Sequence, residues 1–221
     1  MRSAVILEPR AATRGSNDEL RSGDTPGVTR PMTYEEYLAS PEERARYDII
    51  DGYKIYYTWG QEALANPTRE HQDIQGNLYE SFRAWQRRTG TARTVQAPCD
   101  IQITVRPNRV RQPDLLVIST DRLALNPPRV SARPLSPAPE LVAQILLPSD
   151  TRAVLAAKIA DYCTVDVREC WVVAPGSQTV EVLRLSRNGD VAAAGLYGDN
   201  ETAVSVVFPG LMLQVTDVFA E

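Results

Sequence analysis

Hydrophobic residues recur at helical spacing in the stretch that ends at Gly90. Ile74, Leu78, Phe82 and Trp85 follow one another at intervals of four, four and three residues. These intervals place the four side chains on one face of a helix. Gly90, five residues after Trp85, is a residue type that commonly ends a helix. We therefore predict an amphipathic helix that packs on the rest of the domain through this face.

Two more helices are predicted on either side of it. Thr33 is followed three residues later by Glu36, which is the pattern of a capping box, so a short helix should begin after Thr33. The run DTRAVLAAKIADYCTV, residues 150–165, is also predicted to be helical and carries Lys158.

Short apolar and β-branched runs predict strands elsewhere. Asp51-Gly52 between two such runs is a strong signal for a β hairpin. Further strands are expected at 91–105, 109–120, 140–147, 168–175 and 179–186, with short β pieces up to residue 221. This order of elements predicts an α/β fold with a central mixed sheet flanked by helices, an extra β hairpin and C-terminal β pieces.

Length and composition indicate one globular domain. The chain has 221 residues, of which 43% are hydrophobic and 24% charged. Residues 1–31 lack a hydrophobic period, so we predict a disordered extension there and a single domain over 32–221. The longest apolar run near the start, AVIL, is too short for the core of a signal peptide, and no membrane-spanning stretch is seen; a cytoplasmic protein is expected.

Charge is distributed unevenly. The net charge of −4 argues against a protein that coats nucleic acid, but residues 81–138 hold ten arginines against three aspartates. This basic stretch favours a phosphate-bearing partner, and a solvated surface in an arginine-rich chain is the alternative. Lys158 is one of only two lysines, which hints that an ammonium group is needed there.

Three cysteines without CxxC spacing and a single histidine, His71, predict neither a disulfide framework nor a zinc site. His71 is expected to make a polar contact near a helix start.

Four polar residues could supply chemistry together. Asp114 follows Pro113 at the mouth of an apolar strand, Gln144 interrupts the next apolar run, Lys158 lies on the following helix, and Asp48 lies in the first hairpin. Hydrolysis of a phosphodiester needs a hard cation, an activated water and positive charge near the phosphate. Each residue alone has a structural explanation: a turn for Asp114, a buried amide for Gln144, a surface stem for Lys158, and a pair with Arg46 or a cap of the hairpin for Asp48.

Several strings in this order resemble one family. They are MTYEEYLASPEERARYDIIDG, REHQDIQGNLYESFRAW, QPDLLVIS, ELVAQILLPS, a K-x-x-x-Y spacing and ECWVV. Together they are similar to the Uma-type (Uma two) restriction endonucleases of the PD-(D/E)XK nuclease superfamily, from Met32 to the end of the chain. The resemblance implies a restriction-endonuclease-like core and a DNA endonuclease that uses Mg²⁺ or Mn²⁺.

The resemblance also implies roles for single residues. Asp114 corresponds to the metal-binding aspartate, Gln144 to the second acidic ligand, Lys158 to a helix-borne lysine, and Asp48 to a glutamate before Ile-Asp-Gly. The chain departs from the pattern at Gln144, at Tyr53 and at Val154, where acidic residues are usual. Loss of one unit charge at about 4 Å and an effective dielectric near 20 removes on the order of 4 kcal/mol of attraction before desolvation.

Three interpretations therefore stay open. The first is a metal-dependent DNA endonuclease in which Asp114 and Gln144 bind the metal and Asp48 and Lys158 assist. Its phosphate contacts are expected at Arg87, Arg88, Arg109 and Arg111. The second is a catalytically degenerate relative that binds nucleic acid or protein, and the third is an unrelated α/β domain. A homodimer is expected by analogy with nucleases that cut both strands.

Overall fold

The structure is a computed structural model that describes residues 30–41, 47–56, 68–125, 134–148 and 150–220. Nearly all of the extension predicted over residues 1–31 lies outside these described residues, as does the Arg46 partner suggested for Asp48.

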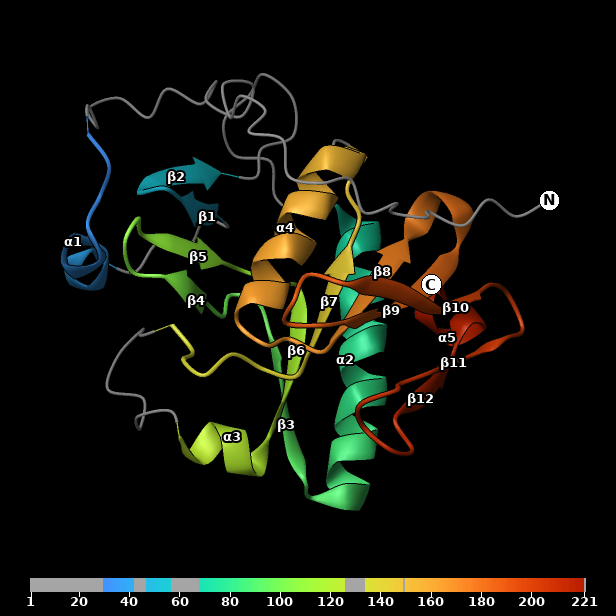
Figure 1. The fold of residues 1–221 in the computed structure, drawn as a ribbon. Helices are drawn as coiled ribbons and strands as arrows, with labels where there is room; N and C mark the ends of the chain where they lie inside the picture. Colours follow the sequence, from blue (N-terminus) through green and yellow to red (C-terminus); the bar gives the residue numbers. More distant parts are fainter. Residues whose placement is uncertain (1–29, 42–46, 57–67, 126–133, 149, 221) are drawn as a thin grey trace.

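The centre of the fold is a six-stranded sheet (Figure 1). Its strands, in spatial order, are β10 (Val191–Tyr197), β9 (Thr179–Leu185), β8 (Glu169–Ala174), β7 (Leu141–Ile145), β6 (Leu115–Ser119) and β3 (Ala92–Gln96). Strands β7 and β8 run parallel and the other neighbouring pairs are antiparallel. The predicted central mixed sheet is thus confirmed.

Two helices cover opposite faces of this sheet. Helix α2 (Arg69–Thr89) packs on one set of alternating strand residues, which includes Leu115 and Ala143. Helix α4 (Arg152–Thr164) packs on the other set, which includes Leu116 and Val142. Because successive side chains of a strand point to opposite faces, the central strands are apolar on both sides and read as nearly continuous hydrophobic runs.

Helix α2 confirms the predicted amphipathic helix. Thr68 caps its start by accepting a hydrogen bond from the backbone N–H of His71, and Gly90 ends it with a φ of 67°, a left-handed conformation that favours glycine. Its apolar face is buried, and the Phe82 ring meets the Trp171 ring edge-on at a centroid distance of 5.2 Å. This packing fixes α2 on the central sheet.

A second, four-stranded sheet lies beside the first. Its spatial order is β2 (Tyr53–Tyr56), β1 (Tyr47–Ile50), β5 (Arg109–Arg111) and β4 (Ile101–Thr104). Strands β1 and β2 form the hairpin predicted at Asp51-Gly52, where both residues have positive φ. Helix α1 (Tyr34–Ala39) begins after Thr33, and both hydrogen bonds of the predicted capping box are present.

Two predicted strands are wrong in extent. Residues 91–105 and 109–120 were each expected to form one strand, but each forms two: β3 and β4, then β5 and β6. In both cases the two pieces belong to different sheets. Pro98 and Pro113 lie at the breaks, and proline has no N–H to donate to a ladder. The second break places Asp114 directly before β6.

The C-terminal β pieces are also present. Strands β11 (Thr202–Val204) and β12 (Met212–Gln214) pair with each other, and α5 (Val215–Val218) follows them. The buried carboxylate of Glu169 holds this region: one oxygen accepts from the Ser205 hydroxyl and from the N–H groups of Val206 and Val207. A short helix, α3 (Thr120–Ala124), directly follows β6.

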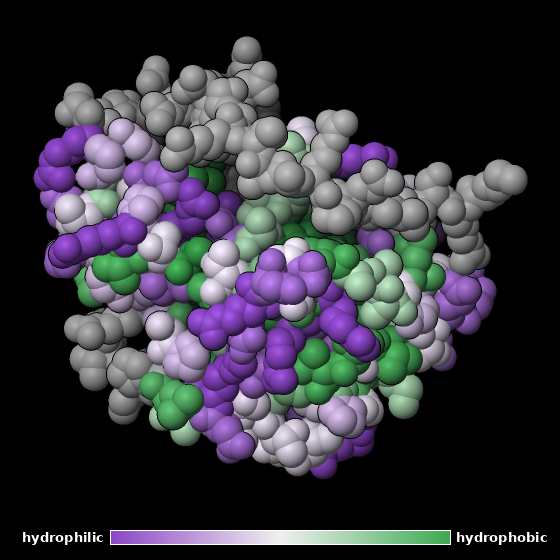
Figure 2. Space-filling model, viewed as in Figure 1, coloured by the Kyte–Doolittle hydropathy of each residue, from purple (hydrophilic) through white to green (hydrophobic). Residues whose placement is uncertain are grey.

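The surface is mixed in character. On the face shown in Figure 2, hydrophilic and hydrophobic residues are interleaved. Within the described parts of the chain, no helix has both the length and the apolar character needed to cross a bilayer.

A buried acid in strand β9 should make stability depend on pH. Glu181 is 4% exposed, one of its oxygens has no hydrogen-bond partner among the described residues, and burial raises the pKa of its carboxyl group. Between the ordinary pKa and the raised one, the folded protein therefore binds more protons than the unfolded chain. The free energy of unfolding therefore falls as pH rises through that window, because the carboxyl group becomes ionised while it is buried.

We predict that the melting temperature of Glu181→Gln, compared with that of wild type, is more favourable at about pH 8 than at about pH 4. At the lower pH less of the wild-type carboxyl group is ionised, so its burial costs less. Thermal unfolding across this pH range checks it, with Glu80→Gln on the exposed side of α2 as the matched control. A difference from wild type that does not change with pH would contradict the assignment.

Candidate functional site

The carboxylate of Asp114 is fully buried at the end of strand β6. Its Oδ2 accepts a hydrogen bond of 2.8 Å from the backbone N–H of Ile145, on the neighbouring strand β7. Its Oδ1 lies 3.1 Å from the Nε2 of His71. A buried carboxylate is costly unless it is compensated, so these two contacts define the centre of the candidate site.

Helix α2 holds residue 114 with two successive turns. His71 approaches the side chain, and Gln75, four residues later, donates from Nε2 to the backbone carbonyl of Asp114 at 3.0 Å. Residues four apart share one face of a helix, so both contacts come from the same side of the sheet. The start of α2 therefore fixes both the backbone and the carboxylate of Asp114.

Gln144 lies opposite Asp114 but is held from the other face. Leu115 pairs with Ala143 in the antiparallel β6–β7 ladder, so the residue before Leu115 comes opposite the residue after Ala143. The Gln144 amide is 3% exposed, and its Nε2 donates to the hydroxyl of Tyr162 on α4 at 2.8 Å. The Gln144 amide is thus oriented by α4, whereas the Asp114 carboxylate is oriented by α2.

Lys158 lies on the side of α4 that faces the sheet. It is 4% exposed and stands one helical turn before Tyr162, so it shares the helix face that contacts Gln144. Burial raises the pKa of the Cys170 thiol, and the Lys158 ammonium acts on that thiol in the opposite direction. The structure therefore brings the lysine into the layer between α4 and the central sheet.

Asp48 belongs to a buried cluster of ion pairs. Its Oδ2 accepts from Arg111 at 2.7 Å and its Oδ1 accepts from the backbone N–H of Gln112 at 2.9 Å. The Arg111 Nε also donates to Asp161 on α4 at 2.7 Å. Asp48 therefore lies beside the segment that leads to Asp114, and its negative charge is balanced by Arg111.

Arg109 joins the same cluster from strand β5. Its guanidinium group contacts Asp161 at 2.9 Å and Asp51 at 2.6 Å. Because the guanidinium groups of Arg109 and Arg111 are bonded to carboxylates, and Arg111 is buried, this geometry argues against the phosphate contacts expected for them from charge alone. Their observed role is to tie the four-stranded sheet to α4.

Arg87 and Arg88 lie far from this cluster. Both are exposed in the last turn of α2. At a rise of 1.5 Å per residue they stand roughly 25 Å from His71 along the helix axis. These two arginines are therefore exposed and distant from Asp114.

The donor set around Asp114 fits one divalent cation better than a cluster of ions. Among the described residues there is no group of three His, Cys, Asp or Glu side chains that could hold a metal. The available donors are the Asp114 carboxylate, the buried nitrogens of His71, which have no hydrogen-bond partner within the described structure, and the Gln144 amide oxygen, since Tyr162 takes its nitrogen. One anionic oxygen with neutral partners predicts weak binding of a hard cation.

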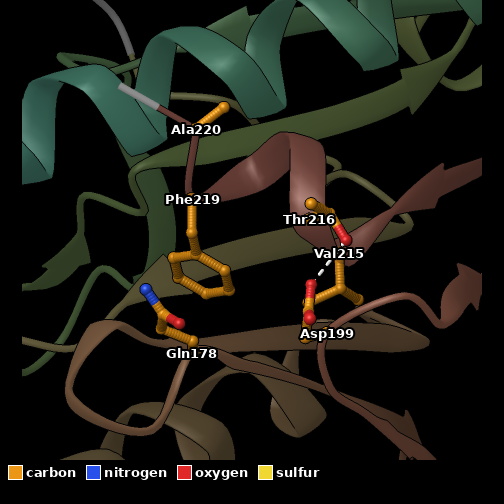
Figure 3. A pocket seen from close by; sticks show the side chains of 6 residues that line it. All are labelled: Gln178, Asp199, Val215, Thr216, Phe219 and Ala220. Atoms are coloured by element: carbon orange, nitrogen blue, oxygen red, sulfur yellow. Dashed lines mark hydrogen bonds between the residues drawn. The ribbon is translucent and has the colours of Figure 1, made fainter.

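A pocket elsewhere in the molecule holds none of these residues. It is lined by Gln178, Asp199, Val215, Thr216, Phe219 and Ala220, around helix α5 (Figure 3). Its carboxylate, Asp199, accepts a hydrogen bond from the Thr216 hydroxyl at 2.7 Å. None of the site residues predicted from the sequence lines this pocket.

Sequence reasoning missed two members of the site region. His71 was expected only to make a polar contact, and Asp161 was not singled out. The contact between His71 and Asp114 joins residues 43 positions apart, and no local pattern reveals it. For Asp161, the available signal was an acidic residue three positions after Lys158 in an otherwise apolar helix.

Comparison with known proteins gives a family and a fold. The family model Uma2, described as "Putative restriction endonuclease", matches residues 34–216. A solved structure described as a "putative nuclease belonging to DUF820" from Anabaena variabilis is similar to this chain, with a TM-score of 0.64 and 20% sequence identity. The similarity covers 86% of this chain and 98% of that one. No curated protein matches the chain.

The ion-pair cluster can be tested through stability. In Arg111→Met, the carboxylates of Asp48 and Asp161 lose a buried partner, so we predict a loss of about 3–5 kcal/mol in the free energy of unfolding. Unfolding by urea measures this loss of free energy. Arg87→Met removes an exposed arginine and should change stability by less than about 0.5 kcal/mol. Equal effects of the two substitutions would contradict the structural role of Arg111.

Proposed function

The chain belongs to the Uma2 family of restriction endonucleases, and from this membership we propose that it is a divalent-metal-dependent endonuclease that hydrolyses DNA phosphodiester bonds. The observation that carries the proposal is the buried Asp114 carboxylate at the end of a central strand, opposite Gln144 and beneath two helices. In this proposal the carboxylate is a ligand of a divalent cation, for which carboxylate oxygens are suitable donors.

Asp114 and Gln144 hold the metal in this proposal. Asp114 contributes Oδ1, because Oδ2 is occupied by the Ile145 N–H, and Gln144 contributes its amide oxygen. The ion is Mg²⁺ or Mn²⁺, since oxygen donors suit both. A bound ion would supply Lewis acidity toward the phosphate and would lower the pKa of a water molecule.

Lys158 and Asp48 assist in different ways. The ammonium of Lys158 neutralises charge that develops on the phosphate as the bond to the leaving oxygen breaks. Asp48 acts indirectly: by binding Arg111 and the Gln112 N–H, it fixes the chain two residues before Asp114. Asp48 is therefore a positioning residue in this proposal.

The DNA backbone extends along α2. Arg87 and Arg88 contact phosphates roughly seven nucleotides from the cleavage point, because phosphates of one strand are spaced by about 3.4 Å along the helix axis. These contacts add affinity without base recognition. Cleavage of both strands takes two copies of the chain, one for each strand.

A second candidate function is supported by Gln144. Here the fold is kept as a nucleic-acid-binding or protein-interaction module that no longer cleaves. Gln144 is neutral, its amide is bonded to Tyr162, and it is oriented from the face opposite to the one that orients Asp114. These features weaken a shared metal site, so this candidate predicts binding without cleavage.

Removal of the carboxylate tests the enzyme proposal. Asp114→Asn keeps the shape and an oxygen for the Ile145 N–H but loses the charge, so we predict that cleavage of plasmid DNA in Mn²⁺ or Mg²⁺ falls by at least about a hundredfold. Asp217→Asn, at an exposed aspartate of α5, is the matched control and should cleave like wild type. Undiminished cleavage by Asp114→Asn would overturn the proposal.

Restoration of the second acid separates the two candidates. Glutamate can replace Gln144 because the Tyr162 hydroxyl can turn and donate to it. We predict that Gln144→Glu binds Mn²⁺ at least about tenfold more tightly in titration calorimetry, through the added charge. If wild type neither binds metal nor cleaves and Gln144→Glu does both, the degenerate candidate is correct. If both proteins cleave, the enzyme proposal is correct.

A further inference from the structure

His71 is the only histidine of the chain, and its ring is buried in an unusual state. The residue is 3% exposed, and neither Nδ1 nor Nε2 has a hydrogen-bond partner within the described structure. Buried polar atoms are nearly always paired, so two unpaired nitrogens on one ring point to a group that binds there.

The contact with Asp114 has the spacing of two metal ligands. Nε2 of His71 and Oδ1 of Asp114 are 3.1 Å apart, but they are not aligned as a hydrogen bond. In an octahedral ion with bonds of about 2.1 Å, neighbouring donors lie about 3.0 Å apart, because they subtend a right angle at the metal. The distance of 3.1 Å therefore allows both atoms to bind a common cation.

The position of His71 is also fixed in advance. Its backbone N–H is held by the Thr68 cap, and one turn later Gln75 binds the carbonyl of Asp114. The helix and the strand end are thus joined at two points, independently of any ion. Such preorganisation keeps both donors in place before a metal arrives.

We infer that His71 is a direct ligand, through Nε2, of the divalent cation held by Asp114. This inference rests on the proposed function and names a further member of its site. It assigns the site one imidazole nitrogen, one carboxylate oxygen and one amide oxygen, in place of a pair of carboxylates.

This donor set determines which metal binds. Magnesium prefers oxygen donors and is usually held by carboxylates, whereas imidazole suits first-row transition metals. The nitrogen of His71 and the loss of an acid at Gln144 both act against Mg²⁺. The site therefore prefers Mn²⁺ to Mg²⁺. The nitrogen of His71 also restores part of the metal affinity that is lost because residue 144 is not a carboxylate.

The test is the electron spin echo of bound Mn²⁺, which detects directly coordinated nitrogen without any cleavage assay. Wild type should show modulation from one imidazole nitrogen, and calorimetry should give at least about tenfold tighter binding of Mn²⁺ than of Mg²⁺. His71→Ala should lose the nitrogen modulation and at least about tenfold in Mn²⁺ affinity. His71→Gln, which keeps a polar side chain, should lose the modulation as well.

Gln72→Ala, at the exposed neighbouring position, is the matched control and should retain both signals. Circular dichroism of the metal-free variants verifies folding. If wild type binds Mn²⁺ and cleaves but shows no nitrogen modulation, His71 is not a ligand and the proposed nuclease stands. If wild type binds no divalent metal and does not cleave, both the inference and the enzyme proposal fail.

Discussion

Compensation of one buried charge organises this molecule. Asp114 lies between Pro113 and the first residue of strand β6, at the end of the central sheet, and its side chain is buried. The Ile145 N–H stabilises one carboxylate oxygen, and the imidazole of His71 faces the other. The Asp114 carboxylate is thus contacted from two elements, strand β7 and helix α2. These contacts join the start of α2 to the central sheet at the position where we propose that a divalent cation binds.

A separate set of charges is complete and serves the architecture. Arg111 is shared by Asp48 and Asp161, and Arg109 bridges Asp161 to Asp51, so two guanidinium groups balance most of three carboxylates. This cluster joins the four-stranded sheet to α4, which carries Lys158 three residues before Asp161. The two groups of buried charges therefore differ in role: the Arg109 and Arg111 cluster joins parts of the fold, and Asp114 is the residue that we propose binds a metal.

Local patterns predicted helices α1, α2 and α4, the hairpin and the mixed central sheet, because spacing, caps and turn residues act over a few positions. The short helices α3 and α5 were not predicted. The amphipathic face of α2 and its Gly90 end are examples. Strand extent was predicted less well, since Pro98 and Pro113 move the chain from one sheet to another and only the tertiary arrangement shows where it goes. Asp114, Gln144 and Lys158 could be selected from order and resemblance. The contact of His71 with Asp114 and the pairing of Arg111 with Asp161 could not, because each joins residues far apart in sequence.

The central claim is that Asp114 binds a divalent cation within this fold, and the most direct test is a crystal structure of the protein grown in Mn²⁺. Data collected at the manganese absorption edge locate the ion without reference to activity. The account predicts one anomalous peak at about 2.2 Å from Asp114 Oδ1, with His71 Nε2 at a similar distance. Saturating Mn²⁺ with no peak within bonding distance of the Asp114 carboxylate would contradict it.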